Sequence, residues 1–139
     1  MKFYTSIRTL AVFSLVILMT LGCAPNTTKE LQAEVKPLVI TVNRDYEEVY
    51  ENLVFQLEGC HTGSVAALHM FVQHRLNRNK QYGEAVLRSI NMGDVSIWLQ
   101  AKVYHQGSSL TKVEIWEPSW GKRRYVVKKW IVDDYQECS

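Results

Sequence analysis

The sequence predicts an α+β domain in which an antiparallel sheet of about five strands carries two helices on one face, in the order strand, helix, four strands, helix. Two observations lead to this prediction. Residues 46–60 have apolar side chains at helical spacing, whereas the segments between residues 66 and 117 alternate between apolar and polar side chains, as half-buried strands do. Turn-forming residues separate these segments, so neighbouring strands are expected to pair as hairpins.

The first strand and the first helix are expected between residues 38 and 60. Residues 38–42, Leu-Val-Ile-Thr-Val, are strand formers in a row. Asn43 or Asp45 can cap the helix that follows, and the acidic residues of its first turn complement the helix dipole. The apolar stripe of this helix, which is expected to pack on the sheet, consists of Tyr46, Val49, Tyr50, Leu53, Leu57 and Cys60.

Four strands are expected next. They cover residues 66–76, 85–90, 95–104 and 110–117, and Pro118 ends the last of them. The 95–104 strand has the clearest alternation. Its buried side is expected to hold Val95, Ile97, Leu99, Ala101 and Val103, and its opposite side Ser96, Trp98, Gln100, Lys102 and Tyr104.

A second helix is expected over residues 120–137, although this segment also contains strand formers. Ser119 is a suitable N-cap residue, and a helix would put Val127, Ile131 and Cys138 on one stripe with Trp120. The helix is favoured over a further strand because such a stripe gives Cys60 a neighbouring helix to pack against.

The N-terminal residues have the pattern of a bacterial lipoprotein signal peptide. Lys2 and Arg8 precede the apolar run 10–21, and Gly22 stands before Cys23. The run is shorter than the roughly 20 apolar residues of a membrane-spanning helix. The pattern predicts cleavage before Cys23 and acylation of its thiol and amine. The protein would then be anchored to a membrane through lipid.

Thr20 and Leu21 stand where a lipobox usually has Leu and a small residue, so an ordinary secretory signal is the alternative. Ala24, in place of an Asp after the cysteine, indicates the inner leaflet of the outer membrane, facing the periplasm. The expected organisation is a lipoprotein signal peptide over 1–22, a lipidated N-terminus and flexible tether over 23–36 with at most a loose helical turn at 30–36, and a single domain over 37–139.

Two cysteines remain once Cys23 is assigned to lipid. An even pair in an oxidising compartment predicts a disulfide between Cys60 and Cys138. The prediction requires two helices packed side by side, because each cysteine ends one of the expected helices. Two free buried thiols are the alternative.

The composition argues against several classes of function. The net charge of +2 comes from Lys2 and Arg8, so the chain without its signal peptide is formally neutral and a nucleic-acid binder is not expected. The basic residues concentrate in one segment, 122–129, where a solvated helix face is the expected arrangement. His69 and His74 have only the nominal spacing of a zinc pair, because residues five apart on a strand face opposite sides, and Asp133 and Asp134 diverge on a helix. We expect no metal, no cofactor and no catalytic residue.

Aromatic side chains give one candidate interaction surface. Trp98, Tyr104 and Trp116 are expected on the sheet face opposite the aliphatic row, where they form either a contact surface for a partner or a cover of cross-strand pairs.

Taken together, the lipobox, the Tyr-Glu-Glu-Val-Tyr start of the first helix, the cysteine at its end, the strand meander and the cysteine near the C-terminus resemble small uncharacterised proteobacterial lipoproteins of the outer membrane and periplasm. The topology is similar to the TBP-like lipoprotein domain of the C component of the outer-membrane protein assembly machine. The resemblance covers essentially the whole mature chain and implies no catalytic residue.

Two functions are compatible with these observations. The first is a non-enzymatic, lipid-anchored interaction or structural module of the cell envelope that contacts an envelope protein. The second is a carrier of a lipid or another apolar ligand, in which helices and a curved sheet enclose a cavity as in START-like helix-grip proteins. About 100 residues supply fewer strands than such a cavity usually needs, so the module is favoured.

Overall fold

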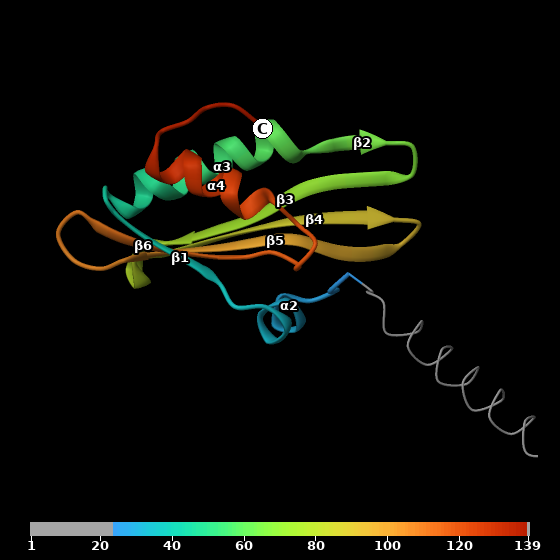
Figure 1. The fold of residues 1–139 in the computed structure, drawn as a ribbon, viewed down its shortest axis with the longest axis horizontal. Coiled ribbons are helices and arrows are strands. Elements are labelled where there is room, and N and C mark those ends of the chain that lie inside the picture. The colour runs from blue at the N-terminus through green and yellow to red at the C-terminus, as the bar shows by residue number, and fades with distance from the viewer. Residues whose placement is uncertain (1–23, 139) are drawn as a thin grey trace, which may run out of the picture.

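The α+β prediction is confirmed by the computed structural model, which describes residues 24–138 (Figure 1). The predicted signal peptide and Cys23 lie outside the described residues. One antiparallel sheet of six strands has the order β1-β6-β5-β4-β3-β2. The elements along the chain are α2 (Thr28–Glu34), β1 (Leu38–Asn43), α3 (Tyr46–His61), β2 (Gly63–Val65), β3 (Leu68–Asn77), the 3-10 turn η1 (Arg78–Lys80), β4 (Tyr82–Asn91), β5 (Asp94–His105), β6 (Leu110–Trp116) and α4 (Arg123–Val132).

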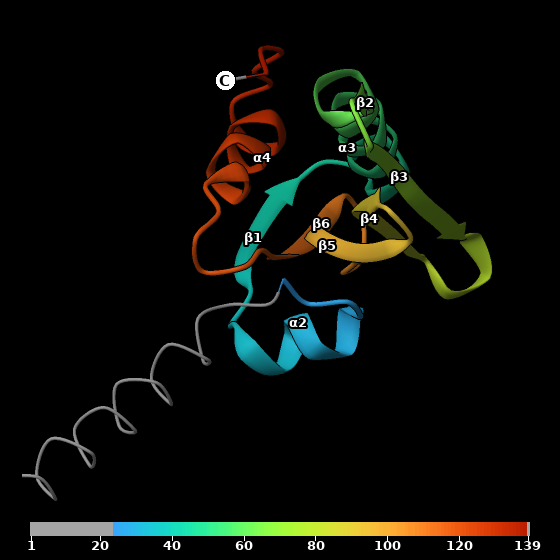
Figure 2. The same ribbon diagram turned by 90° about the vertical axis from the view of Figure 1, so that its right-hand side faces the viewer.

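The sheet separates two layers of helix. Helices α3 and α4 cover one face, as predicted, and we call it the helix-pair face (Figures 1 and 2). Helix α2 lies on the opposite face, the α2 face. Every pair of neighbouring strands runs antiparallel, and the chain enters the sheet at the β1 edge.

Helix α3 forms where the sequence predicts it. The Asp45 side chain accepts a hydrogen bond from the backbone N–H of Glu47 at 2.8 Å, which caps the helix. The apolar stripe faces the sheet, and the main core lies between them. This core consists of buried side chains from both helices and from strands β1, β4, β5 and β6, among them Ile40, Val49, Leu53, Leu57, Leu87, Leu99, Val103, Val113, Ile115, Val127, Trp130 and Ile131.

Strand β5 departs from the predicted alternation at a β-bulge. Leu87 pairs with Leu99, but the next residue of β4, Arg88, pairs with Ile97, so Trp98 is the extra residue on β5. The bulge reverses the faces of the preceding residues. Ile97 therefore packs on the α2 face, and Trp98 packs on the helix-pair face, opposite to the prediction for both.

The segment expected to be a flexible tether is folded onto the sheet. Thr27 and Glu30 form a capping box that starts α2, and Leu31 of this helix is fully buried beside Trp116. The backbone of the chain is held from Pro25 onward, because the Pro25 carbonyl accepts a hydrogen bond from the N–H of Ile97 at 2.8 Å. The expected tether is wrong for residues 25–34, since one buried leucine and a capping box suffice to dock a short helix.

Two further differences concern the ends of the sheet and the C-terminal segment. The sixth strand, β2, has three residues, too few for an alternation to be recognised, and pairs with the start of β3. The predicted helix over 120–137 is shorter in the structure, where α4 ends at Val132 and a non-helical segment continues to Cys138.

Candidate functional site

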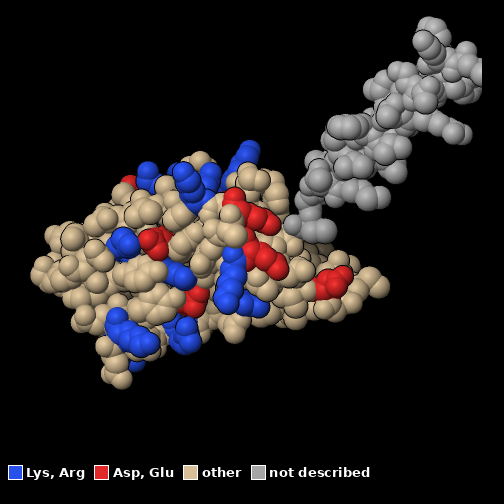
Figure 3. All heavy atoms as spheres, turned by 90° about the horizontal axis from the view of Figure 1, so that it is seen from below, with Lys and Arg blue, Asp and Glu red and all other residues tan. Residues whose placement is uncertain are grey.

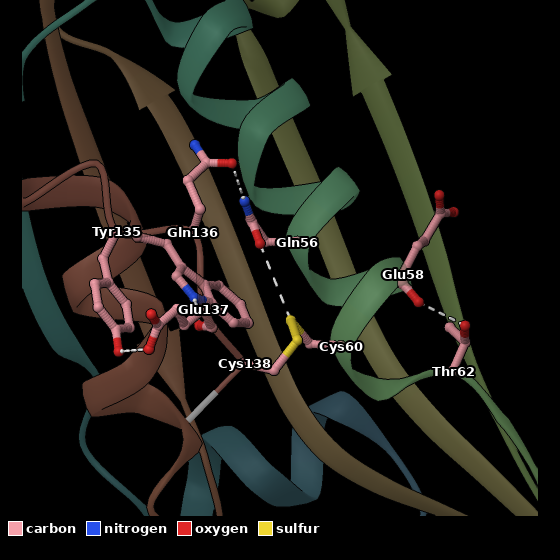
Figure 4. Close-up of a disulfide and its surroundings, with 9 residues drawn as sticks. Gln56, Glu58, Cys60, Thr62, Tyr135, Gln136, Glu137 and Cys138 are labelled. Carbon is pink, nitrogen blue, oxygen red and sulfur yellow. Dashed lines mark hydrogen bonds between the residues drawn. A yellow bond between two sulfur atoms is a disulfide. The ribbon is translucent and has the colours of Figure 1, made fainter.

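The disulfide is confirmed: Cys60 and Cys138 are bonded, with their Cα atoms 5.2 Å apart (Figure 4). Cys60 lies in the last turn of α3, as predicted. Cys138 arrives from the segment after α4, not from a helix end, and the predicted stripe that joined it to Trp120 is therefore wrong.

The C-terminal segment folds back over α3 to reach this bond. The Gln56 side-chain amide donates to the side-chain oxygen of Gln136 at 3.0 Å, and Figure 4 shows the two side chains reaching toward each other from α3 and from the C-terminal segment. The indole N–H of Trp130 donates to the carbonyl of Glu137 at 2.8 Å. The disulfide, an amide pair and a buried indole thus hold residues 133–138 in one place.

A surface groove of about 340 Å³ opens beside the disulfide on the helix-pair face. Its walls combine aromatic and basic side chains with one cysteine of the disulfide, and they consist of His61, Trp98, Trp120, Gly121, Lys122, Arg123, Val126 and Cys138. A second groove of about 280 Å³ lies between the end of α3 and the β2–β3 hairpin and shares His61 and the disulfide with the first.

Trp98 is fixed in the groove from three sides. Its indole N–H donates to the Ser89 hydroxyl at 2.7 Å, its ring meets the Trp120 ring edge to face at 5.0 Å, and the Arg123 guanidinium lies 4.9 Å from its centroid. Trp120 itself is 52% exposed. A rigid aromatic surface flanked by a cation is the arrangement found at the centres of binding surfaces.

The basic side of the groove depends on a buried carboxylate at the start of α4. Glu117 is 1% exposed and accepts hydrogen bonds from the backbone N–H groups of Arg123 at 2.7 Å and Arg124 at 3.0 Å. It therefore caps the helix, a role that the sequence predicts for Ser119. The guanidinium of Arg123 lies 3.9 Å from the same carboxylate, which holds this side chain beside Trp98.

Substituting Gly121 is expected to disrupt this cap. A Cβ at Gly121 would lie 2.2 Å from the carboxyl group of Glu117, so G121A must displace the carboxylate from the two amides. We expect a loss of about 1–3 kcal/mol in the free energy of unfolding, the cost of leaving buried groups unpaired. Urea denaturation measures it. Gly59 of α3 is the matched control, because nothing lies within 4 Å of its Cβ and G59A is expected to stabilise by about 0.5–1 kcal/mol. If G121A and G59A changed the free energy of unfolding equally, Glu117 would not be the cap of α4.

His61 lies between the two grooves. Its Nε2 is buried without a hydrogen-bond partner among the described residues, and its ring lies 5.9 Å from that of Trp130. Burial, and then the nearby charge of Arg123, lower the pKa of His61 below its ordinary value of 6.5. The histidine is therefore neutral at pH 7, and the positive charge of the groove comes from Lys122 and Arg123.

Comparison with known proteins gives no match: no family model, no curated protein and no solved structure is similar to this chain. Within residues 24–138, no helix has the length and hydrophobicity needed to cross a membrane. In the same residues, no three His, Cys, Asp or Glu side chains come together as metal ligands would. His69 stacks on Phe71, whereas His74 contacts Tyr50 of α3, so the two histidines face opposite sides of β3 as predicted.

The three aromatic residues predicted as one interaction surface do not lie together. Trp98 belongs to the helix-pair face because of the β5 bulge, whereas Tyr104 and Trp116 lie on the α2 face. Trp116 is buried under α2 beside Leu31, and Lys102 covers its ring at 5.3 Å. Trp116 is therefore covered by α2 and is not part of an exposed contact surface.

Tyr104 lies in a polar part of the α2 face. Its ring is 5.3 Å from that of Tyr82, and Lys112 lies 5.0 Å above it. Burial, followed by the charge of Glu114, raises the pKa of Tyr104 to about 12, so the hydroxyl stays protonated. Figure 3 views the molecule from this side and shows basic and acidic side chains interleaved. On the α2 face, the charges neutralise one another and Trp116 is covered. The groove beside the disulfide is therefore the better candidate site.

Sequence reasoning did not single out Trp120 as a site residue. The available signal was its position between Pro118 and the basic segment 122–129, because an exposed tryptophan beside cations is typical of a contact site. The solvated helix face expected for that segment is confirmed for Lys128 and Lys129, which are exposed on α4.

Proposed function

We propose that the protein is a lipid-anchored lipoprotein of the cell envelope whose domain is a non-enzymatic interaction module, and that the groove of Trp98, Trp120 and Arg123 contacts an acidic segment of an envelope protein. The observation that carries this proposal is the exposed Trp120 ring, held edge to face on Trp98 in a groove that Lys122 and Arg123 also line. Tryptophan and arginine are the residues most enriched where binding energy concentrates.

The charge of the groove supports an acidic partner. Residues 122–129 contain five basic and no acidic residues. The carboxylate of Glu117, which lies against the start of this segment, is buried and engaged with the amides of α4. Complementary charge on a partner would speed its association with this surface and orient it.

The compartment is supported by the chemistry of the cysteines. A disulfide between Cys60 and Cys138 requires an oxidising environment, which the periplasm provides and the bacterial cytosol does not. The basic leader, the apolar run and Gly22-Cys23 supply the export and acylation signal. Outer-membrane anchoring and the resemblance to the C lipoprotein of the assembly machine stay predictions.

The packing between the helices and the sheet favours the module over the carrier. Leu53, Leu57, Leu99 and Trp130, which lie in that space, are all fully buried and in one cluster. An apolar ligand between helices and sheet would have to displace these side chains.

Placing a photo-cross-linking amino acid at position 120 of the full chain in living bacteria tests the proposal. The expected product is a covalent adduct with one envelope protein, identified by mass spectrometry. Calorimetry with that purified partner should then show affinity about 30-fold weaker for W120A, the loss of a binding hot spot. Y125A is the matched control, because Tyr125 is equally exposed on α4 but outside the groove, and its affinity should not change. A lipid adduct at position 120 would instead indicate the carrier.

A further inference from the structure

We propose that one end of the sheet, formed by the tips of the β2–β3 and β4–β5 hairpins, rests on the lipid surface that holds the anchor. This hairpin-tip patch consists of Val65, Ile90 and Met92. The inference rests on the proposed acylation of Cys23. It adds that the domain has a defined orientation, in which the end of the sheet with the hairpin-tip patch faces the bilayer.

Only a short stretch of chain separates the proposed anchor from the fold. The Pro25 carbonyl is bonded to the N–H of Ile97, and the N–H groups of Asn26 and Thr27 both donate to the Glu30 carboxylate, at 2.9 and 3.2 Å. The backbone is therefore held from Pro25 onward. Two residue steps separate Pro25 from Cys23, and they span at most about 7 Å when fully extended.

The N-terminal end of the described chain is attached near one end of the sheet. Ile97 lies near the start of β5, next to the β4–β5 turn, in which Asn91 pairs with Asp94. The β2–β3 turn lies at the same end, because Leu68 of β3 pairs with Asn91. Figure 1 shows both hairpin tips pointing toward the side on which the described chain begins. An acyl group within about 7 Å of Pro25 thus brings this end to the lipid headgroups.

The hairpin tips carry exposed apolar side chains. Met92 is 91% exposed and Val65 is 77% exposed, the highest values for large apolar side chains within residues 24–138. Met92 also has a φ of 51°, a left-handed conformation that favours Gly or Asn and is costly for a methionine. A single formal charge, Asp94, accompanies the turn 91–94. Two exposed apolar tips beside an anchor are suited to insertion at the boundary between headgroups and acyl chains.

The opposite end of the sheet provides the contrast. The β5–β6 hairpin includes Leu110, and the length of β5 separates it from the hairpin-tip patch. Twelve residues of strand correspond to about 40 Å, which is well beyond the reach of the anchor.

Photo-cross-linking on the full chain in its membrane tests the inference. The cross-linking amino acid replaces Met92 in one protein and Leu110 in the control, and the acylation of Cys23 is measured by mass spectrometry of the N-terminal peptide from the same preparations. We expect a phospholipid adduct at position 92 and none at position 110.

Each outcome decides a separate claim. An acylated protein without a phospholipid adduct at position 92, or with as much adduct at position 110, would overturn the orientation and leave the proposed function standing. A protein adduct at position 92 would overturn it as well, because the patch would then be a contact for a partner. Lack of acylation together with lack of adduct would overturn both the orientation and the lipid anchor, whereas an adduct without acylation would overturn the anchor alone.

Discussion

Replacing both cysteines of the disulfide, in the variant C60S/C138S, is expected to lower the free energy of unfolding by about 4.5 kcal/mol in the chain-entropy model. The bond joins residues that are 78 apart in the sequence. Without it, the unfolded chain gains the conformational entropy of that long loop, which stabilises the unfolded state. A loss of this size is a large share of the stability of a small domain, typically about 5–15 kcal/mol. Urea denaturation of the oxidised parent and the variant measures it.

We expect the C-terminal segment, residues 133–138, to detach from α3 in this variant before the core unfolds. Without the bond, residues 133–138 keep only non-covalent contacts, among them those of Gln136 with Gln56, of Glu137 with Trp130 and of Tyr135 with the core. Hydrogen exchange should therefore become faster in this segment than in α3. The reduced parent is the matched control, because it should have the same stability as the variant. A difference of less than about 1 kcal/mol in the free energy of unfolding between the variant and the oxidised parent would contradict the prediction, because the disulfide would then not destabilise the unfolded chain.

This disulfide was predictable because counting requires no geometry. Removing Cys23 leaves an even pair, and the chain has one helix whose apolar stripe ends at Cys60. The route of Cys138 to its partner was not predictable, because the helix ends at Val132 and the chain turns at Asp134, which has a left-handed φ of 51° without being a glycine. Local propensity favours either helix or strand in this segment, so tertiary packing decides where the helix ends.

The candidate site was predicted only in part, and a single bulge explains the difference. Strict alternation along β5 puts Trp98 on one face with Tyr104, and an extra residue in that strand moves Trp98 to the other face. No residue in the strand marks the bulge, because glycine is absent from it. Without a local signal, the grouping of Trp98 with Trp120 and Arg123 requires the three-dimensional structure.

The sequence does contain an indication of helix α2, although the polar composition of the segment suggests a tether. Thr27 and Glu30 have the spacing of a capping box, which predicts a helix start within a polar segment. Leu31 is the apolar residue that packs on the sheet, and one leucine gives no periodicity. A seven-residue helix is marginal in isolation, so its stability depends on this contact with the sheet.

Truncating Trp130 is expected to produce the second large effect. Trp130 is the largest fully buried side chain of the described residues and joins α4, α3 and the C-terminal segment. W130A removes its packing and leaves the carbonyl of Glu137 without its donor. We expect the free energy of unfolding to fall by about 3–5 kcal/mol, the usual cost of removing a buried aromatic ring. Thermal and urea denaturation measure it.

W120A is the matched control for this substitution. It is the same chemical change three residues before α4 begins at Arg123, at a side chain that is 52% exposed, and it should cost less than about 1 kcal/mol. Equal losses for W130A and W120A would mean that the core assignment is wrong. The losses of W130A and C60S/C138S should not add, because Glu137 bonds to Trp130 one residue before Cys138. A double-mutant cycle should therefore give a coupling of about 0.5–3 kcal/mol, which identifies the indole and the disulfide as one structural unit.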